Sequence, residues 1–247
     1  MGTIHFHAEG DIAVLTIDSP GKLNAFTRAM RAEIGRRLDE IAVDPRFIGV
    51  VVTGAGDACC AGQDLEESSQ WGHDVPWVEE FEAFHRAFLR FMKPSVACVN
   101  GVAAGGGFQM ALMCDSRVGC PDTRMGQPEV RTGLASVTGT WAMQRALGDL
   151  RARELALTGR LMKSDELLQL GILSCVVPRD QLVDTALDTV RAFAANPADS
   201  FRRTKTWIYE SASDELARLY ADAGRLHRMG FASGVSQAGA KKFLGTT

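Results

Sequence analysis

The sequence predicts an α/β fold, and three observations support this prediction. Short apolar runs typical of buried strands alternate with longer segments in which apolar residues recur every three or four positions. Two glycine-rich turns, at 61–65 and 101–107, each follow a strand-like run and lead into a possible helix start. From residue 200 onward only the helical pattern occurs, which suggests a boundary near Asn196.

The individual elements follow from these patterns in order along the chain. The expected strands are apolar or alternating runs at 11–17, 47–53, 95–99, 116–120 and 172–177. The expected helices are at 27–42, 77–92, 107–114, 151–157, 164–170 and 183–195. The polar segment 66–76 has no clear period and is expected to be a loop. The chain is therefore expected to divide into a core, 1–195, and a C-terminal helical region, 196–247.

Composition excludes several classes of protein. Of the 247 residues 46% are hydrophobic, enough for a buried core, and the net charge of −3 argues against nucleic-acid binding. The six cysteines show no CxxC spacing, which favours buried free thiols in a reducing compartment over a zinc site or a disulfide scaffold. The sequence shows neither a secretory signal nor a run of about 18 apolar residues, so we expect a cytoplasmic protein without membrane contact.

The two glycine-rich turns carry the functional signal. Glycine lets the backbone approach a ligand closely and adopt angles that other residues avoid. A helix start leaves backbone N–H groups unpaired and carries a partial positive charge. Two such turns that converge in space could therefore direct two N–H groups at one oxygen, the arrangement that stabilises a developing oxyanion.

Four motifs give the chain a specific resemblance. They are Pro20-Gly21-Lys22-Leu23-Asn24-Ala25, Ala61-Gly62-Gln63-Asp64-Leu65, Val99-Asn100-Gly101-Val102-Ala103-Ala104-Gly105-Gly106-Gly107 and Gln127-Pro128-Glu129. In order and spacing the chain resembles the enoyl-CoA hydratase/isomerase family, also called the crotonase superfamily. The resemblance implies a spiral of ββα turns capped by a C-terminal helical region that assembles homotrimers or homohexamers. It also implies an acyl-CoA thioester substrate, with coenzyme A as part of that substrate and no metal or redox cofactor.

The resemblance assigns roles to individual residues. The backbone N–H groups of Gln63 and Gly106 are the expected oxyanion donors, and the Gln63 side chain is not required for this. Residues expected to contact the substrate or its CoA arm are Lys22, Asn24, Ala25, Ala61, Gly62, Asp64, Leu65, Gly105, Pro128 and Gly133. Lys22 is suited to meet a phosphate, although a solvated surface lysine is a comparable interpretation. For Asp64 the favoured role is to hold the turn by backbone hydrogen bonds.

Glu129 is the expected acid/base. Deprotonation next to a thioester needs a base, and partial burial raises a carboxylate pKa toward the working pH. The alternative is a glutamate that only stabilises the first turn of a following helix. The family resemblance favours the catalytic role.

Gln109 departs from the family pattern. Hydratases of the family place a second glutamate there, whereas a glutamine can hydrogen-bond a water but cannot accept its proton. One carboxylate is enough to move a proton between two carbons, so 3-to-2 isomerisation of an enoyl-CoA is favoured over hydration, with Gln109 kept as a catalytic candidate. Decarboxylation, thioester hydrolysis and a non-catalytic acyl-CoA binder stay open.

Two further segments are weaker candidates. Ser136-Val137-Thr138-Gly139 is expected either to shape the acyl end of the pocket or to pack in the core, and His73 is a possible substrate contact.

A dinucleotide-binding oxidoreductase and a serine hydrolase fit the sequence less well. Dinucleotide fingerprints fail where Cys59 and Met110 replace the final glycine, and no G-x-S-x-G elbow occurs.

Overall fold

The computed structural model describes residues 2–71 and 75–245, which form two sheets surrounded by helices. The strands are β1 (Thr3–Glu9), β2 (Ile12–Asp18), β3 (Gly49–Gly54), β4 (Ala58–Cys60), β5 (Ser95–Val99), β6 (Val102–Ala104), β7 (Ser116–Gly119), β8 (Arg124–Gly126), β9 (Leu161–Lys163) and β10 (Cys175–Val176). The helices are α1 (Arg28–Val43), α2 (Leu65–Ser68), α3 (Trp77–Leu89), α4 (Gly106–Met113), α5 (Val137–Leu147), α6 (Asp149–Thr158), α7 (Ser164–Gln169), α8 (Leu182–Ala194), α9 (Ala198–Glu210), α10 (Ser213–Ala232) and α11 (Val235–Leu244). Two short 3-10 helices, η1 (Glu129–Thr132) and η2 (Arg179–Gln181), complete the set.

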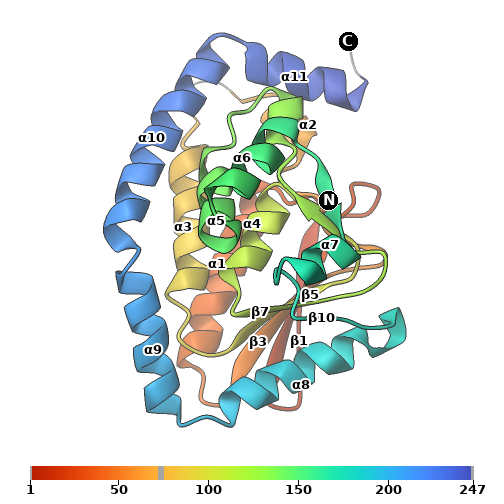
Figure 1. Ribbon diagram of the computed structural model, residues 1–247, viewed down its shortest axis with the longest axis vertical. Helices are drawn as coiled ribbons and strands as arrows, with labels where there is room; N and C mark the ends of the chain where they lie inside the picture. The colour runs from red at the N-terminus through yellow and green to blue at the C-terminus, as the bar shows by residue number, and fades with distance from the viewer. Residues whose placement is uncertain (1, 72–74, 246–247) are drawn as a thin grey trace.

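The larger sheet has the strand order β1-β2-β3-β5-β7-β10. Strand β1 is antiparallel to β2, and every later neighbour is parallel. Alternate residues of these strands point to opposite faces. Val51 and Val96 pack with Leu187 of α8, whereas Val50 and Val52 belong to the larger core with α1, α3 and α4. Figure 1 shows α8 alone on its side of the strands, with α1, α3 and α4 on the other. Both faces are thus covered, as the continuous apolar runs require.

The smaller sheet explains why the functional motifs meet. Its order is β4-β6-β8-β9, and β4, β6 and β8 run parallel. Three successive chain segments each add one strand to the large sheet, one to the small sheet and then a helix: β3-β4-α2, β5-β6-α4 and β7-β8-η1. This is the predicted ββα spiral. Because parallel strands end at the same edge of a sheet, the residues after β4, β6 and β8 lie side by side.

The C-terminal helices pack on the core. Helix α10 lies against α3 and α5, and α11 lies against α2 and η1. Figure 1 shows α9 and α10 (blue) along one flank and α11 across the end near α2. Within the described residues no helix is long and apolar enough to cross a membrane. The predicted division at residue 196 stays a prediction.

Several sequence-based boundaries need correction. Residues 66–68, expected at the start of a loop, belong to helix α2, which Asp64 caps. Segment 172–177 forms a strand only at Cys175–Val176, and the helix α5 was not predicted. The three-residue strands of the small sheet were also missed, since only their neighbours in the spiral supply hydrogen bonds. The six cysteines are free, with Cys175 half-buried and the others buried, as expected.

Candidate active site

A cavity of about 610 Å³ lies where the three turns of the spiral meet. Both glycine-rich turns, the Glu129 segment, α3 and α10 contribute to its wall. The apolar wall and few convergent polar groups are typical of a small-molecule site.

The two glycine-rich turns touch. A Cβ atom placed on Gly62 would lie 2.7 Å from the Ala104 carbonyl oxygen and 3.1 Å from the Gly106 nitrogen. Gly105 has φ 55° and ψ −124°, a conformation that glycine adopts readily and other residues avoid. Glycine at these two positions therefore allows the close approach on which a shared oxyanion site depends.

Both expected oxyanion donors are available to a ligand. Around Gln63 the neighbouring backbone groups pair with Phe26, as Phe26 N donates to Gly62 O at 2.8 Å and Asp64 N donates to Phe26 O at 3.0 Å. Gly106 is the first residue of α4, so its N–H precedes the helical hydrogen bonds. Within the described residues, neither the Gln63 nor the Gly106 N–H donates to a protein acceptor.

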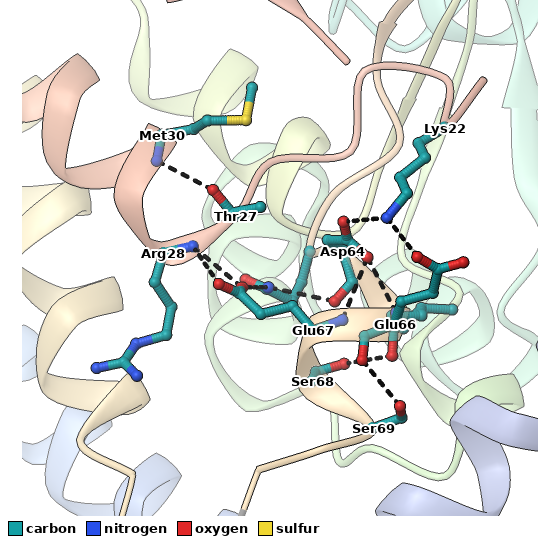
Figure 2. A network of polar contacts seen from close by, with 11 residues as sticks. Lys22, Thr27, Arg28, Met30, Asp64, Glu66, Glu67, Ser68 and Ser69 are labelled. Carbon is teal, nitrogen blue, oxygen red and sulfur yellow. Dashed lines mark hydrogen bonds and ion pairs between the residues drawn. The ribbon is translucent and has the colours of Figure 1, made fainter. Parts of the chain in front are cut away.

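The first turn is held rigidly by Asp64. Its side chain accepts hydrogen bonds from the backbone N–H groups of Glu66 at 2.9 Å and Glu67 at 3.3 Å, which caps α2. Lys22 donates to Asp64 at 2.7 Å and to Glu66 at 2.6 Å, as Figure 2 shows. Both carboxylates raise the pKa of Lys22. The expected turn-holding role of Asp64 thus has a geometric basis.

The Gln63 side chain is also anchored. Its Nε2 donates to Glu67 at 2.7 Å, and its Oε1 accepts from Arg31 of α1. Arg31 is 1% exposed and lies 4.8 Å from the centre of the Phe81 ring, and burial lowers its pKa to about 10. The contact with Arg31 was not predicted, because nothing local to either residue signals it.

Glu129 lies at the carboxyl end of β8, in the first turn of η1. It is half-buried and lines the cavity, and a Cβ on Gly105 would meet its Oε1 at 2.9 Å. Burial raises the pKa of Glu129 to about 7. A carboxylate with this pKa, beside the turn that presents the Gly106 N–H, is suited to take and return a proton near neutral pH.

Gln109 lies one helical turn beyond the Gly106 N–H and is joined to Glu129 through Gln127. With its carboxamide oriented by its neighbours, Gln127 places its nitrogen 2.5 and 2.6 Å from the two Glu129 oxygens and its oxygen 2.8 Å from Gln109 Nε2. Gln109 Oε1 accepts from Thr138 at 2.8 Å. Gln127 is part of the motif Gln127-Pro128-Glu129, but sequence analysis assigned it no role.

The far wall of the cavity is aromatic and comes from two helices. Trp77 and Phe81 of α3 line it together with Tyr220, His227 and Phe231 of α10. The Trp77 and His227 rings are 4.4 Å apart, and burial lowers the pKa of His227 to about 4, so its imidazole is neutral. The α10 residues were not predicted, since 91 or more positions separate them from the last of the motifs in the sequence.

Most predicted site residues meet in the cavity. The predicted catalytic and binding residues that line it are Lys22, Ala25, Ala61, Gln63, Asp64, Leu65, Gly105, Gly106, Gln109, Pro128 and Glu129. Ser136, Val137 and Thr138 of the weaker candidate segment also line it. Asn24, Gly62 and Gly133 do not line it. His73 lies outside the described residues.

The three predicted residues that do not line the cavity have structural roles. Asn24 is 4% exposed, donates to Ala55 O at 2.8 Å and Ala58 O at 2.7 Å, and accepts from Ser19 N at 3.0 Å. These bonds use its side chain within the protein. Gly62 lies at the meeting point of the turns, and Gly133, with φ 78°, ends η1. None of the three therefore presents a side chain to the cavity.

Comparison with known proteins identifies the family of this chain. The sequence profile of the family described as Enoyl-CoA hydratase/isomerase matches residues 7–247. Mevalonyl-coenzyme A hydratase sidH of Aspergillus fumigatus is 36% identical over 213 residues, which cover 83% of this chain and 78% of that protein. The short-chain-enoyl-CoA hydratase of Clostridium acetobutylicum is 31% identical over 213 residues, covering 84% and 81%.

The fold has close structural counterparts. The crystal structure of an enoyl-CoA hydratase/isomerase from Mycobacterium paratuberculosis is similar to this chain, with a TM-score of 0.88 and 22% identity over 97% of each chain. This ββα spiral, with the glycine-rich turns beside the half-buried Glu129 carboxylate, defines a crotonase-fold protein. With the profile matched over nearly its whole length, this chain belongs to the enoyl-CoA hydratase/isomerase family.

Proposed function

We propose that this enzyme moves the double bond of an enoyl-CoA thioester from position 3 to position 2. Glu129 takes a proton from C2, and the electron pair passes into a dienolate as the thioester oxygen becomes negative. The Gln63 and Gly106 N–H groups stabilise that oxygen. Glu129 then returns the proton to C4, so that C2=C3 forms and C3=C4 is lost. The reaction is redox-neutral, and no atom enters or leaves.

The observation that carries this proposal is that, among the described residues of the cavity wall, one carboxylate has no ion-pair partner. Among the described residues that line the cavity, three are acidic: Asp64, Glu66 and Glu129. Asp64 and Glu66 are both paired with Lys22. Glu129 alone is left to carry a proton, and one carboxylate suffices when both proton positions belong to one substrate.

Hydration is the second candidate. It is favoured by the names of the relatives, since sidH is called a mevalonyl-coenzyme A hydratase and the Clostridium acetobutylicum protein a short-chain-enoyl-CoA hydratase. Addition of water needs a group that takes a proton from the water while another protonates C2. Gln109 cannot accept that proton, so Glu129 would have to serve both steps.

The proposal also covers phosphate binding, assembly and location. The Lys22 ammonium at the cavity wall is suited to a CoA phosphate once it leaves Asp64 or Glu66. Assembly as a homotrimer or homohexamer and a cytoplasmic location remain proposals from the family resemblance.

A panel of thioesters tests the reaction. Wild-type enzyme is assayed with 3-hexenoyl-CoA for conversion to the 2-enoyl product and with 2-hexenoyl-CoA for water addition. We expect bond migration to be faster, and Glu129→Gln to abolish it while binding of butyryl-CoA persists. Glu40→Gln, an exposed surface carboxylate on α1, serves as the control and should keep full turnover. Water addition at the faster rate would favour the second candidate.

A further inference from the structure

An unbroken chain of side-chain hydrogen bonds leads from α5 to the catalytic carboxylate. Thr138 Oγ1 donates to Gln109 Oε1 at 2.8 Å, and Gln109 Nε2 donates to Gln127 Oε1 at 2.8 Å. The Gln127 nitrogen then lies 2.5 and 2.6 Å from the Glu129 oxygens. The four residues come from α5, α4, the end of β8 and η1, so only the folded chain joins them.

We propose that Thr138 is a positioning residue for catalysis, acting on Glu129 through Gln109 and Gln127. The inference rests on the proposed acid/base role of Glu129. It reassigns Gln109 from a catalytic candidate to the middle link of a chain that orients the base.

The direction of the chain follows from the two different ends of each amide. A carboxamide donates only through nitrogen and accepts only through oxygen. An ionised Glu129 only accepts, so the Gln127 nitrogen faces it and the Gln127 oxygen accepts from the Gln109 nitrogen. The Gln109 oxygen is then left facing the Thr138 hydroxyl. The Thr138 hydroxyl, which can donate or accept, donates to this oxygen and so holds the Gln109 amide in place.

This orientation favours the form of Glu129 that works as a base. Hydrogen bonds donated to a carboxylate stabilise its charged form, and this opposes the effect of burial. In the reversed orientation, Gln127 would direct its amide oxygen at the carboxylate oxygens, and only a protonated Glu129 could donate a hydrogen bond to it. Loss of the Thr138 hydroxyl leaves the Gln109 oxygen without this donor and weakens the hold of the two amides on Glu129.

The packing around Gln127 shows that the chain is built into the fold. Gln127 is 0% exposed, and a Cβ on Gly139 would lie 2.9 Å from Gln127 Cγ and closer still to its amide. Gly139 follows Thr138 directly in α5. The same turn of helix thus supplies both the hydroxyl that ends the chain and the space in which the Gln127 amide lies.

Thr138→Val and Thr138→Ser test the inference in the whole enzyme. Valine keeps the shape and removes the hydroxyl, whereas serine restores the donor. With 3-hexenoyl-CoA we expect the valine variant to lose about 3- to 10-fold in kcat, the range that one net hydrogen bond supports, with little change in KM. Its kcat/KM should fall off at a higher pH on the acid side, because the base is harder to ionise. The serine variant should stay near wild type.

Thr140→Val is the matched control. Thr140 lies in the same helix, but its hydroxyl is bonded to the backbone oxygen of Ser136 and not to the chain that leads to Glu129. Butyryl-CoA affinity and thermal melting check that each variant is folded. The pH profile of Glu129 also depends on the charged side chains of η1 and of the elements packed against it, α6 and α11. These are unchanged in all the variants and therefore cancel in the comparison: Arg131, Asp149, Arg151, Arg153, Glu154, Lys241 and Lys242.

The outcomes separate this inference from the proposed function. Wild-type enzyme that neither isomerises 3-hexenoyl-CoA nor hydrates 2-hexenoyl-CoA overturns the proposed function, and the inference with it. Active wild-type enzyme with a Thr138→Val variant equal to it in kcat and pH profile overturns the inference alone. A loss in Thr138→Val that serine does not rescue, or that Thr140→Val shares, also overturns it. The expected loss with serine rescue and a silent Thr140→Val supports it.

Discussion

Replacing Gly139 by alanine places a methyl group where the Gln127 amide lies. The added carbon would be 2.9 Å from Gln127 Cγ and nearer to the amide itself, in a residue that is 0% exposed. Either the surrounding core shifts or Gln127 leaves Glu129. Overpacking of this kind costs about 1 to 3 kcal/mol. In a chain of this length, that cost corresponds to a melting temperature lower by about 2 to 12 °C.

The catalytic cost follows from the bonds that Gln127 makes. A hydrogen bond to a charged group contributes about 1.5 to 3 kcal/mol. If Gln127 is displaced from Glu129, we therefore expect kcat to fall by about 10- to 100-fold. The measurement is kcat and kcat/KM for 3-hexenoyl-CoA across pH 5 to 9, together with a thermal melt of the same preparation.

Gly35→Ala is the matched control for this variant. Gly35 is also a helical glycine, but a Cβ there would lie 3.7 Å from the Ala87 Cβ, an ordinary contact. Both variants gain helix propensity, about 1 kcal/mol, so their difference isolates the effect of crowding Gln127. A Gly139→Ala variant as stable and as active as Gly35→Ala would refute the reasoning.

Two further predictions concern stability. The Glu129 pKa of about 7 lies above its unfolded value, so the folded state loses stability as pH rises from about 4.5 through 7. The Glu129→Gln variant does not have this loss. Its free energy of unfolding relative to wild type, measured in urea, should therefore be higher at pH 8 than at pH 5 by up to about 3 kcal/mol. An equal difference at both pH values would contradict this. Asn24→Ala removes the side chain that bonds Ser19, Ala55 and Ala58, and should cost about 2 to 4 kcal/mol in the same assay with KM unchanged. A raised KM without loss of stability would instead indicate the substrate contact first expected there.

Much of the fold could be predicted from local patterns. The apolar positions Met30, Ile34, Leu38 and Ile41 are all buried in α1, as their spacing predicted. Short strands such as β6 and β8 could not be predicted, because three residues carry too little periodicity. A possible helix start was indicated after the first glycine-rich turn, but residues 66–68 of α2 were expected to be a loop, because this helix depends on the Asp64 cap more than on an apolar face.

The sequence by itself determined the family, the two glycine-rich turns and the candidate base, since each is a short motif whose chemistry is local. It also showed that Gln109 stands where a second carboxylate was expected. Only the tertiary structure decided what Gln109 does, because its hydrogen-bond partners, Thr138 and Gln127, come from other elements of the fold. The aromatic wall from α10 was likewise decided by packing, since residues far apart in the chain become neighbours only when the spiral closes.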